Sequence, residues 1–119
     1  TERYWRFSKL RGDEVEQTLL DWDRFRSAML AFMSDHDAIL CPADSQPAPA
    51  HGQDAKLPFN YTLPFSLAGW PCAVVRAGTS AQGMPIGVQF AAKPWREDIV
   101  LSLAQRVEEA LGGWQPPPL

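Results

Sequence analysis

A short helix with a sharp stop is encoded in the stretch Tyr61-Thr62-Leu63-Pro64-Phe65-Ser66-Leu67-Ala68-Gly69-Trp70-Pro71. Thr62 is a good N-cap residue type, and Pro64 falls in the first turn, where its missing N–H costs nothing. Gly69 suits the left-handed conformation that ends many helices, and Pro71 prevents the helix from continuing. The sequence therefore predicts a helix over 62–68 and an extended segment directly after it.

Two runs after this helix have the character of β-strands. They are Cys72-Ala73-Val74-Val75-Arg76-Ala77 and Ile86-Gly87-Val88-Gln89-Phe90, and a polar turn region over 78–83 separates them. Strands joined by a loop of this kind favour an antiparallel hairpin. A last helix begins near residue 94, with Glu97 and Asp98 complementing its positive N-terminal end. Its apolar face consists of Ile99, Leu103, Val107, Ala110 and Leu111.

Upstream of the short helix, apolar residues recur at steps of three and four over 13–34. Asp13 and Glu16 have the spacing of a capping box and predict the start of this helix. Its apolar stripe consists of Val15, Leu19, Trp22, Phe25, Arg26, Met29, Phe32 and Met33. The continuously apolar run 38–41 then predicts a strand buried on both faces. The proline-rich stretch 42–58 predicts a long loop, a kind that is usually functional or disordered.

The predicted order of helix, strand, short helix, hairpin and helix indicates the α/β class. Three short strands and two amphipathic helices give only a thin core for 119 residues. We therefore expect 1–119 to be a single partial domain whose other faces pack against sheet from a missing part of the domain. Taken alone it would have open strand edges, so we expect it to associate, with a homo-oligomer as one outcome.

Composition narrows the class of protein. The net charge is −3, the isoelectric point is near 5.2 and no basic patch is present, which argues against nucleic acid as a partner. No apolar run approaches a membrane span and no signal-peptide pattern opens the chain, so we expect no membrane partner and, by default, a cytoplasmic location. The polar and aromatic residues from Thr1 onward lead us to expect an internal starting point within a longer protein.

Local motifs for the common chemistries are absent from the sequence. There is no Gly-x-Ser-x-Gly elbow, no phosphate-binding loop and no Cys-x-x-Cys pair. His36 and His51 flank Cys41, so a Cys–His hydrolase or a metal site that includes Asp37 is conceivable. Cys41 ends an apolar run and no ligand spacing is recognisable, so we favour a core thiol and no metal. We expect Cys41 and Cys72 to be buried free thiols.

Several segments, in order, resemble the amidase signature family of Ser-Ser-Lys hydrolases. The stretch 36–42 looks like the family's Asp-x-hydrophobic-hydrophobic-x-Pro strand, and 47–49 falls in the place of its Pro-Ala-Pro loop. The stretch 61–71 matches its Thr-x-Pro-x-Asn-x-x-Gly-x-Pro pattern, with Ser66 where Asn is frequent. Then follow Gly83-Met84-Pro85-Ile86-Gly87-Val88-Gln89 and Pro94-Trp95-Arg96-Glu97-Asp98. The resemblance covers most of 20–115 and identifies the chain as the C-terminal part of such a protein.

The resemblance implies an α/β/α sandwich around a mixed sheet, with catalysis by a lysine and two serines in the N-terminal and central part of the family's domain. No Gly-Gly-Ser-Ser loop is present here, and Lys9, Lys56 and Lys93 do not match the context of the catalytic lysine. No catalytic residue can therefore be carried over. Arg76 stands where Pro is common in the family and Cys41 where Thr is common, departures that touch packing more than chemistry.

For this part of the family, the resemblance implies a wall of the acyl-binding cavity. The proline-rich loop and the segment 62–68 resemble regions that border this cavity, and an apolar acyl group requires hydrophobic walls. The residues suited to contact substrate are Phe59, Tyr61, Thr62, Leu63, Phe65 and Trp70. The aromatic residues among them are equally suited to be the core of a short connector helix, and both interpretations stay open.

The sequence leaves two main candidate functions, which belong to different classes, and a third with less support. In the first, a parent protein uses a serine to attack the carbonyl of a small-molecule amide, forms an acyl-enzyme and releases ammonia or an amine without any cofactor, while this chain alone is inactive. In the second, the chain is a non-catalytic, amidase-related domain that binds itself or a partner protein. The least supported third function is a hydrolase that depends on Cys41.

Overall fold

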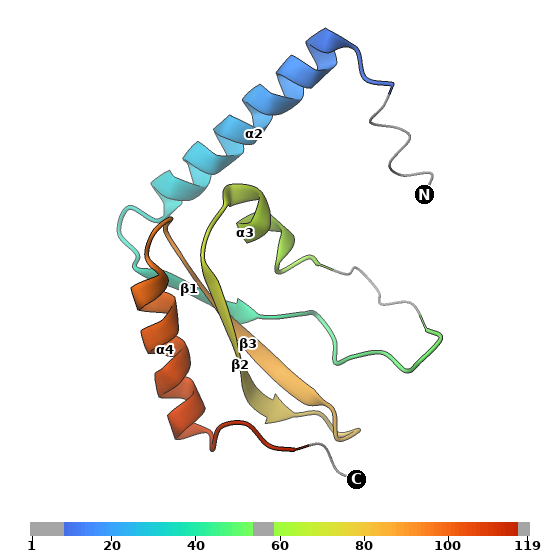
Figure 1. The fold of residues 1–119 in the computed structure, drawn as a ribbon, viewed down its shortest axis with the longest axis vertical. Coiled ribbons are helices and arrows are strands. Elements are labelled where there is room, and N and C mark those ends of the chain that lie inside the picture. The colour runs from blue at the N-terminus through green and yellow to red at the C-terminus, as the bar shows by residue number, and fades with distance from the viewer. Residues whose placement is uncertain (1–8, 54–58, 117–119) are drawn as a thin grey trace.

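The computed structural model describes residues 9–53 and 59–116, and its elements follow the predicted order (Figure 1). They are helix α2 (Gly12–Phe32), strand β1 (Ala38–Pro42), helix α3 (Leu63–Ala68), strands β2 (Cys72–Thr79) and β3 (Pro85–Ala92), and helix α4 (Glu97–Ala110). Part of the predicted loop, 54–58 with Lys56, lies outside the described residues. The α/β class predicted from the sequence is confirmed.

The three strands form one antiparallel sheet in the order β1-β3-β2. Strands β2 and β3 are the predicted hairpin, and both are longer than expected. Ser80 closes its turn, because its N–H donates to the Met84 carbonyl at 2.8 Å and its hydroxyl accepts from the Met84 N–H at 3.2 Å. The mixed sheet that the resemblance implies is not formed by the described strands themselves, which all run antiparallel.

Strand β1 differs from its prediction as a strand buried on both faces. It lies at an edge of the described sheet and pairs with β3 alone. Leu40, opposite Phe90 in the register, is 61% exposed because α4 packs over β2 and β3 instead. The buried strand is β3, whose residues 89–92 are all buried at the centre of the sheet.

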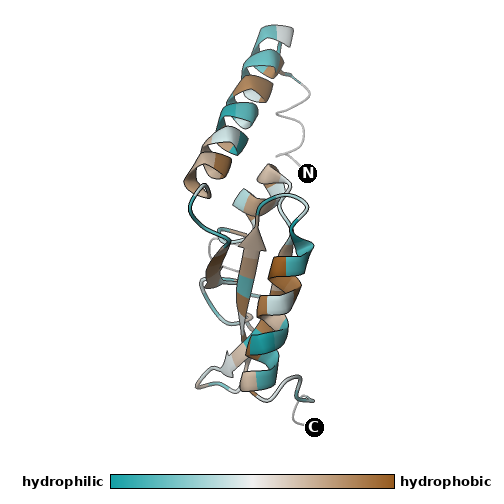
Figure 2. Ribbon diagram, turned by 90° about the vertical axis from the view of Figure 1, so that its left-hand side faces the viewer, coloured by the Kyte–Doolittle hydropathy of each residue, from teal (hydrophilic) through white to brown (hydrophobic). Residues whose placement is uncertain are grey.

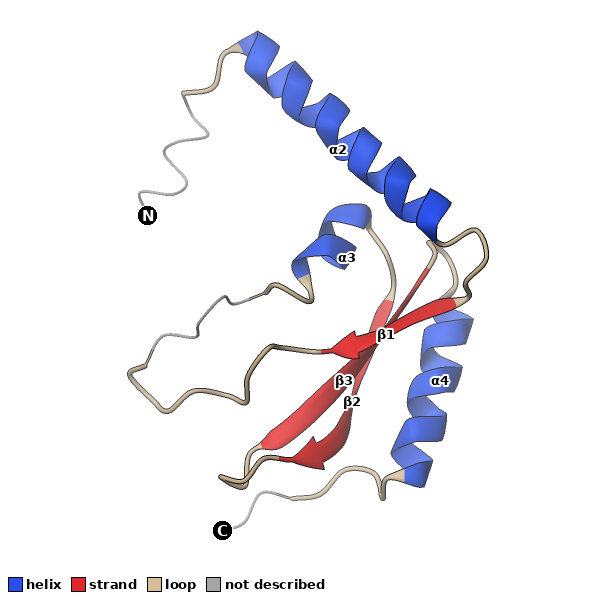
Figure 3. Cartoon of the chain, turned by 180° about the vertical axis from the view of Figure 1, so that it is seen from behind, coloured by secondary structure: helices blue, strands red, loops and turns tan. Residues whose placement is uncertain are grey.

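Helix α4 covers one face of the sheet. Val100 and Ala104 are buried against Phe90 and Ala92 of β3. Of the apolar face predicted for this helix, Ile99, Leu103 and Val107 pack around this cluster, while Ala110 and Leu111 are exposed. Side chains on a strand alternate between faces, so Ala91 points to the other side. There α3 lies between α2 and the sheet, as both face views show (Figures 1 and 3).

Helix α2 differs most from its prediction. It begins at Gly12, and the Arg11 N–H donates to the Glu14 carboxylate at 2.7 Å, so the predicted capping pair 13–16 is wrong. Its predicted apolar stripe is largely uncovered: Leu19 is 52% and Trp22 44% exposed. The hydropathy view shows this helix projecting beyond the sheet with apolar residues along its length (Figure 2).

The buried end of the α2 stripe lies at its C-terminal side. Phe25 and Met29 pack against the core, and Met33, directly after the helix, is fully buried. Nearer the N-terminus of α2, the Trp22 indole N–H donates to the Leu67 carbonyl of α3.

The chain is more extended than a compact domain of its length. Its radius of gyration is 17.6 Å, whereas a compact domain of this length has about 13–14 Å. The described residues therefore cover only part of the apolar surface that the sequence provides.

The end of α3 is the best-specified local structure in the chain. Gly69 adopts φ 71° and ψ 36°, the Gly69 N–H donates to the Ser66 carbonyl at 3.3 Å, and the Trp70 N–H donates to the Phe65 carbonyl at 3.0 Å. This is the hydrogen-bond pattern of a Schellman motif. The motif also brings the Phe65 and Trp70 rings together, with centroids 6.2 Å apart. The predicted stop at Gly69 is confirmed.

Replacing Gly69 by Ala should lower the free energy of unfolding by about 1 kcal/mol or more, because a side chain at positive φ strains the backbone. A Cβ at Gly69 would meet no atom within 4 Å, so the loss of stability would come from backbone strain and not from a steric clash. Gly12→Ala is the matched control, since a Cβ there also meets nothing and its φ is not positive. Urea denaturation of both variants checks this, and equal losses would contradict it.

Candidate functional site

The candidate site is the segment 59–70, which approaches the sheet through a tight turn and then forms α3. Phe59 is one of two non-glycine residues with positive φ in the described part of the chain, at 70°. Its carbonyl accepts from the Leu63 N–H at 2.8 Å and from the Thr62 N–H at 3.1 Å. Backbone outliers of this kind cluster at functional sites, and here the outlier sets the first turn of α3.

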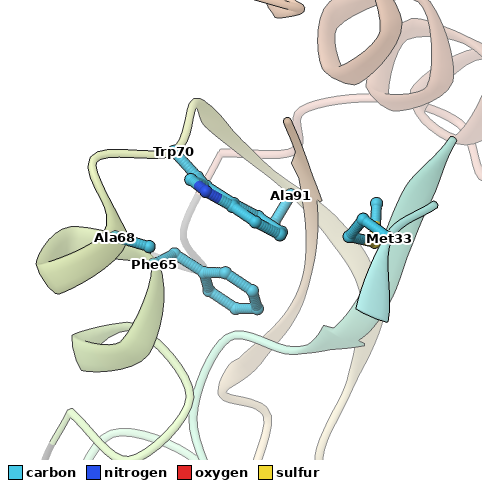
Figure 4. Close-up of a cluster of buried hydrophobic side chains, with 5 residues drawn as sticks. All are labelled: Met33, Phe65, Ala68, Trp70 and Ala91. Carbon is cyan, nitrogen blue, oxygen red and sulfur yellow. The ribbon is translucent and has the colours of Figure 1, made fainter. Parts of the chain in front are cut away.

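Two of the predicted substrate-contacting residues point inward. Phe65 and Trp70 are 7% and 6% exposed, and they form a buried cluster with Met33, Ala68 and Ala91. The close-up view shows both rings facing the strand that carries Ala91 (Figure 4). Phe65 and Trp70 therefore form the core beneath α3 and support the segment from behind.

The other predicted residues lie on the outer side of the segment. Phe59 is 67% exposed, Leu63 52% and Tyr61 38%. Thr62 is half-buried, and its hydroxyl donates to the Phe59 carbonyl at 3.4 Å. The structure thus divides the aromatic residues, with part of the set in the core and part available at the surface. Contact of either part with a substrate stays a prediction.

Gln89 is a buried polar residue that the sequence patterns above do not single out. It lies on β3 with 2% of its surface exposed. Its side-chain amide donates to the Tyr61 carbonyl at 3.0 Å and contacts the Cys41 sulfur at 3.6 Å. The signal in the sequence is a glutamine between apolar residues of a central strand, where an unpaired amide would be costly.

An open cleft of about 1090 Å³ lies at the other end of the hairpin, between the proline-rich loop and the strands. Its lining includes Asp44 and Arg76 as charged side chains and none of the residues of 59–70. The Arg76 guanidinium donates to the Thr79 hydroxyl at 2.6 Å, so one of its donors is occupied within the strand end. The cleft and the aromatic segment are therefore separate features of the fold.

No hydrogen bond joins a cysteine to a histidine within the described residues. Both cysteines are free, as predicted, but Cys72 is exposed and not buried, and Cys41 is half-buried. Partial burial, and secondarily Cys41, raise the pKa of the Cys72 thiol above its ordinary value. His36 is exposed and stacks on Phe32 with ring centroids 5.3 Å apart.

Neither a metal-binding cluster nor a helix suited to span a membrane is present within 9–53 and 59–116. No group of three His, Cys, Asp or Glu side chains there could hold a metal ion. No helix of those residues is long and apolar enough to cross a membrane. His51 and Asp37, which the sequence places near Cys41 in the chain, are thus not gathered into a metal-binding group.

Comparison with known proteins identifies the family. The family model described as Amidase matches residues 8–101, so the chain belongs to the amidase family. Human fatty-acid amide hydrolase 2 is 32% identical over 118 residues, which are 98% of this chain and 20% of that protein. One subunit of the glutamyl-tRNA(Gln) amidotransferase of Xanthobacter autotrophicus is 38% identical over 90 residues, 68% of this chain and 18% of that protein.

Solved structures give the same result for the fold. A 6-aminohexanoate cyclic dimer hydrolase complexed with substrate superposes with a TM-score of 0.81 at 26% identity, over 98% of this chain and 28% of that one. A chain of an inhibitor-bound vestigial protein complex, which bears on the evolutionary origins of an s-triazine catabolic enzyme, gives a TM-score of 0.78 at 26% identity over 93% of this chain and 27% of that one. The chain therefore spans between 18% and 28% of the length of these relatives.

The division into inward and outward residues predicts a contrast in stability. Phe65→Ala should lower the free energy of unfolding by about 3–5 kcal/mol, since it empties the core beneath α3. Tyr61→Ala should cost under about 1 kcal/mol, because the side chain is exposed and the hydrogen bond from Gln89 goes to the backbone carbonyl. Denaturation followed by tryptophan fluorescence measures both, and similar losses would refute the division.

The raised pKa of Cys72 predicts slow alkylation for an exposed thiol, because less thiolate is present at neutral pH. The rate of modification by iodoacetamide should rise with pH. Cys41→Ala should change this rate only slightly, because partial burial is the larger cause of the raised pKa of Cys72 and Cys41 the smaller one. Peptide mass spectrometry measures the modification rate of each cysteine. In the variant Cys72→Ala, Cys41 is the single cysteine left to react. Fast modification of Cys41 with loss of an activity would instead support the Cys41-dependent hydrolase.

Proposed function

We propose that the chain is the C-terminal part of an enzyme that hydrolyses a carbon–nitrogen amide bond, and that 59–70 forms one wall of its acyl-binding cavity. The observation that carries this is the outward group Phe59, Tyr61 and Leu63, which stands on a segment held from behind by Phe65 and Trp70. Apolar side chains on a rigid support are what a cavity for an apolar acyl group requires.

The names of the relatives support amide chemistry in the parent protein. They include a fatty-acid amide hydrolase and a 6-aminohexanoate cyclic dimer hydrolase. In the proposed reaction a serine attacks the amide carbonyl, a second serine relays its proton to a lysine, the amine departs, and water releases the acyl group. This chain has no two consecutive serines. We propose that it is inactive alone and that the remainder of the domain supplies the catalytic residues.

The open shape of the chain supports a partial domain. The stripe of α2 is exposed at Val15, Leu19 and Trp22, and one edge of β1 is unpaired in the described sheet. Burial of this surface against the rest of an amidase fold would remove apolar area from water at about 25 cal/mol per Å². The missing N-terminal part of the domain is thus the partner that we propose first.

The test is the coding sequence directly upstream of Thr1, followed by assay of the protein it encodes. We expect an in-frame Gly/Ser-rich loop and a lysine, labelling of the full-length protein by a serine-directed fluorophosphonate, and amine release from amides with apolar acyl groups. The 119-residue chain alone should do neither. Leu63→Ala in the full-length protein should raise KM for long acyl groups about tenfold and leave acetamide turnover unchanged, with Gln105→Ala on α4 as control. A start codon beside Thr1 would refute this function.

The second candidate is a non-catalytic, amidase-related domain that pairs with a second copy of itself. The same exposed stripe and strand edge favour it, because such surfaces promote association. It predicts a stable dimer in sedimentation at micromolar concentration and a monomer for the variant Leu19→Glu, Trp22→Glu. A cooperatively folded monomer of the wild-type chain would exclude it.

A further inference from the structure

Gln89 is the one side chain with a polar end group that is fully buried in the described part of the chain, at 2% exposure. It sits at the centre of β3, opposite Cys41 of β1 and Val74 of β2 in the register. A buried amide without hydrogen bonds costs free energy, so its partners show why the fold tolerates it. No buried side-chain nitrogen or oxygen in those residues lacks a partner.

The side-chain amide of Gln89 has two N–H donors, and two acceptors are within reach. The Tyr61 carbonyl oxygen lies 3.0 Å from Nε2, which is a good hydrogen-bond length. The Cys41 sulfur lies 3.6 Å away and is a weak acceptor. The bond to Tyr61 is therefore the stronger, and it joins residues 28 positions apart in the sequence.

This bond ties the first half of the candidate wall to the sheet. The other hydrogen bonds of 59–63 in the described structure are local, from Thr62 and Leu63 to the Phe59 carbonyl and from Ser66 to Thr62. The second half of the segment is fixed differently, by the buried rings of Phe65 and Trp70. Without Gln89, the residues that carry the outward side chains would have no polar link to the rigid strand beneath them.

We propose that Gln89 is the positioning residue of the acyl-binding wall. Its side-chain amide fixes the position of the Tyr61 backbone relative to β3. It thereby determines the positions of the Phe59, Tyr61 and Leu63 side chains relative to the acyl group. The proposal deepens the proposed function and rests on it for the identity of the ligand, an apolar acyl chain. Its structural part stands on contacts within this chain alone.

Gln89→Glu tests the structural part because one variant has two states. A protonated carboxyl can donate its O–H to the Tyr61 carbonyl, whereas an ionised carboxylate repels that oxygen. Burial raises the pKa of a glutamate carboxyl, so the donating form is present at acidic pH and is lost as pH rises. The other titratable or charged side chains on the elements meeting here are Cys41 of β1, Cys72 and Arg76 of β2, and Tyr61. The Arg76 guanidinium donates to the Thr79 hydroxyl.

The readout is amide hydrogen exchange of 62–70 in the 119-residue chain, compared with wild type at each pH. In Gln89→Glu this segment should exchange within about twofold of wild type near pH 5 and at least about tenfold faster at the alkaline end of a series from about pH 5 to 9, where the carboxyl is ionised. Gln89→Met should be faster at both. Gln105→Glu, on the exposed surface of α4, should match wild type throughout. A segment that stays unchanged in Gln89→Glu across the whole pH series, or one that does not recover near pH 5, overturns the proposal even if the Met variant fails to fold.

The functional part is tested in the full-length protein at a pH where 62–70 exchanges faster in Gln89→Glu than in wild type. Gln89→Glu should raise KM for amides with long apolar acyl groups about tenfold, whereas Gln105→Glu on the exposed surface of α4 should leave KM at the wild-type value. Faster exchange without any change in KM would overturn the positioning role and leave amide hydrolysis intact. Absence of amide turnover by the wild-type full-length protein would overturn the proposed function and the acyl wall together.

Discussion

The packing of Phe65 and Trp70 against Ala91 holds together parts of the chain that are far apart in the sequence. The alanine offers no side chain beyond Cβ, so the two rings can approach the central strand directly. Met33 joins the same cluster and brings the end of α2 to the sheet. Two residues before Ala91 on the same face, Gln89 adds a polar bond to the apolar contact. Strand β3 therefore both positions the candidate wall and supports it from beneath.

The features that the sequence predicts well are those specified by neighbours in the chain. Gly69 and the proline after it determine the end of α3, whichever surface the helix meets. The hairpin depends on Ser80 and Gly83, whose turn contacts are local, and α4 begins with the acidic pair that its N-terminal dipole favours. Each of these elements has its cause within a few residues, which is why the pattern was sufficient.

The features that the sequence does not predict depend on partners distant in the chain. The apolar stripe of α2 has the period of a buried helix, but periodicity does not indicate which part of the protein covers the helix. In this structure Leu19 and Trp22 of the stripe are exposed. The apolar run 38–41 has the composition of a central strand, yet Leu40 lies at an edge because its pairing is decided by β3. The bond from Gln89 to Tyr61 goes to a backbone carbonyl, a group that every residue has and no composition reveals. For the same reason the pattern could not divide Phe65 from Tyr61.

The strand order has a consequence for how the chain folds during its synthesis on the ribosome. Leu40 pairs with Phe90, so β1 leaves the ribosome long before the strand that completes it. At synthesis rates of about 5–20 residues per second, β1 waits roughly 3–10 s for β3. During that time Ile39 and Leu40 lack the strand with which they pair, and an unpaired apolar strand edge can act as a template for other nascent chains. The β2–β3 hairpin forms from neighbouring residues and is synthesised after β1, so pairing with β3 is the step that protects this edge of β1 from such encounters.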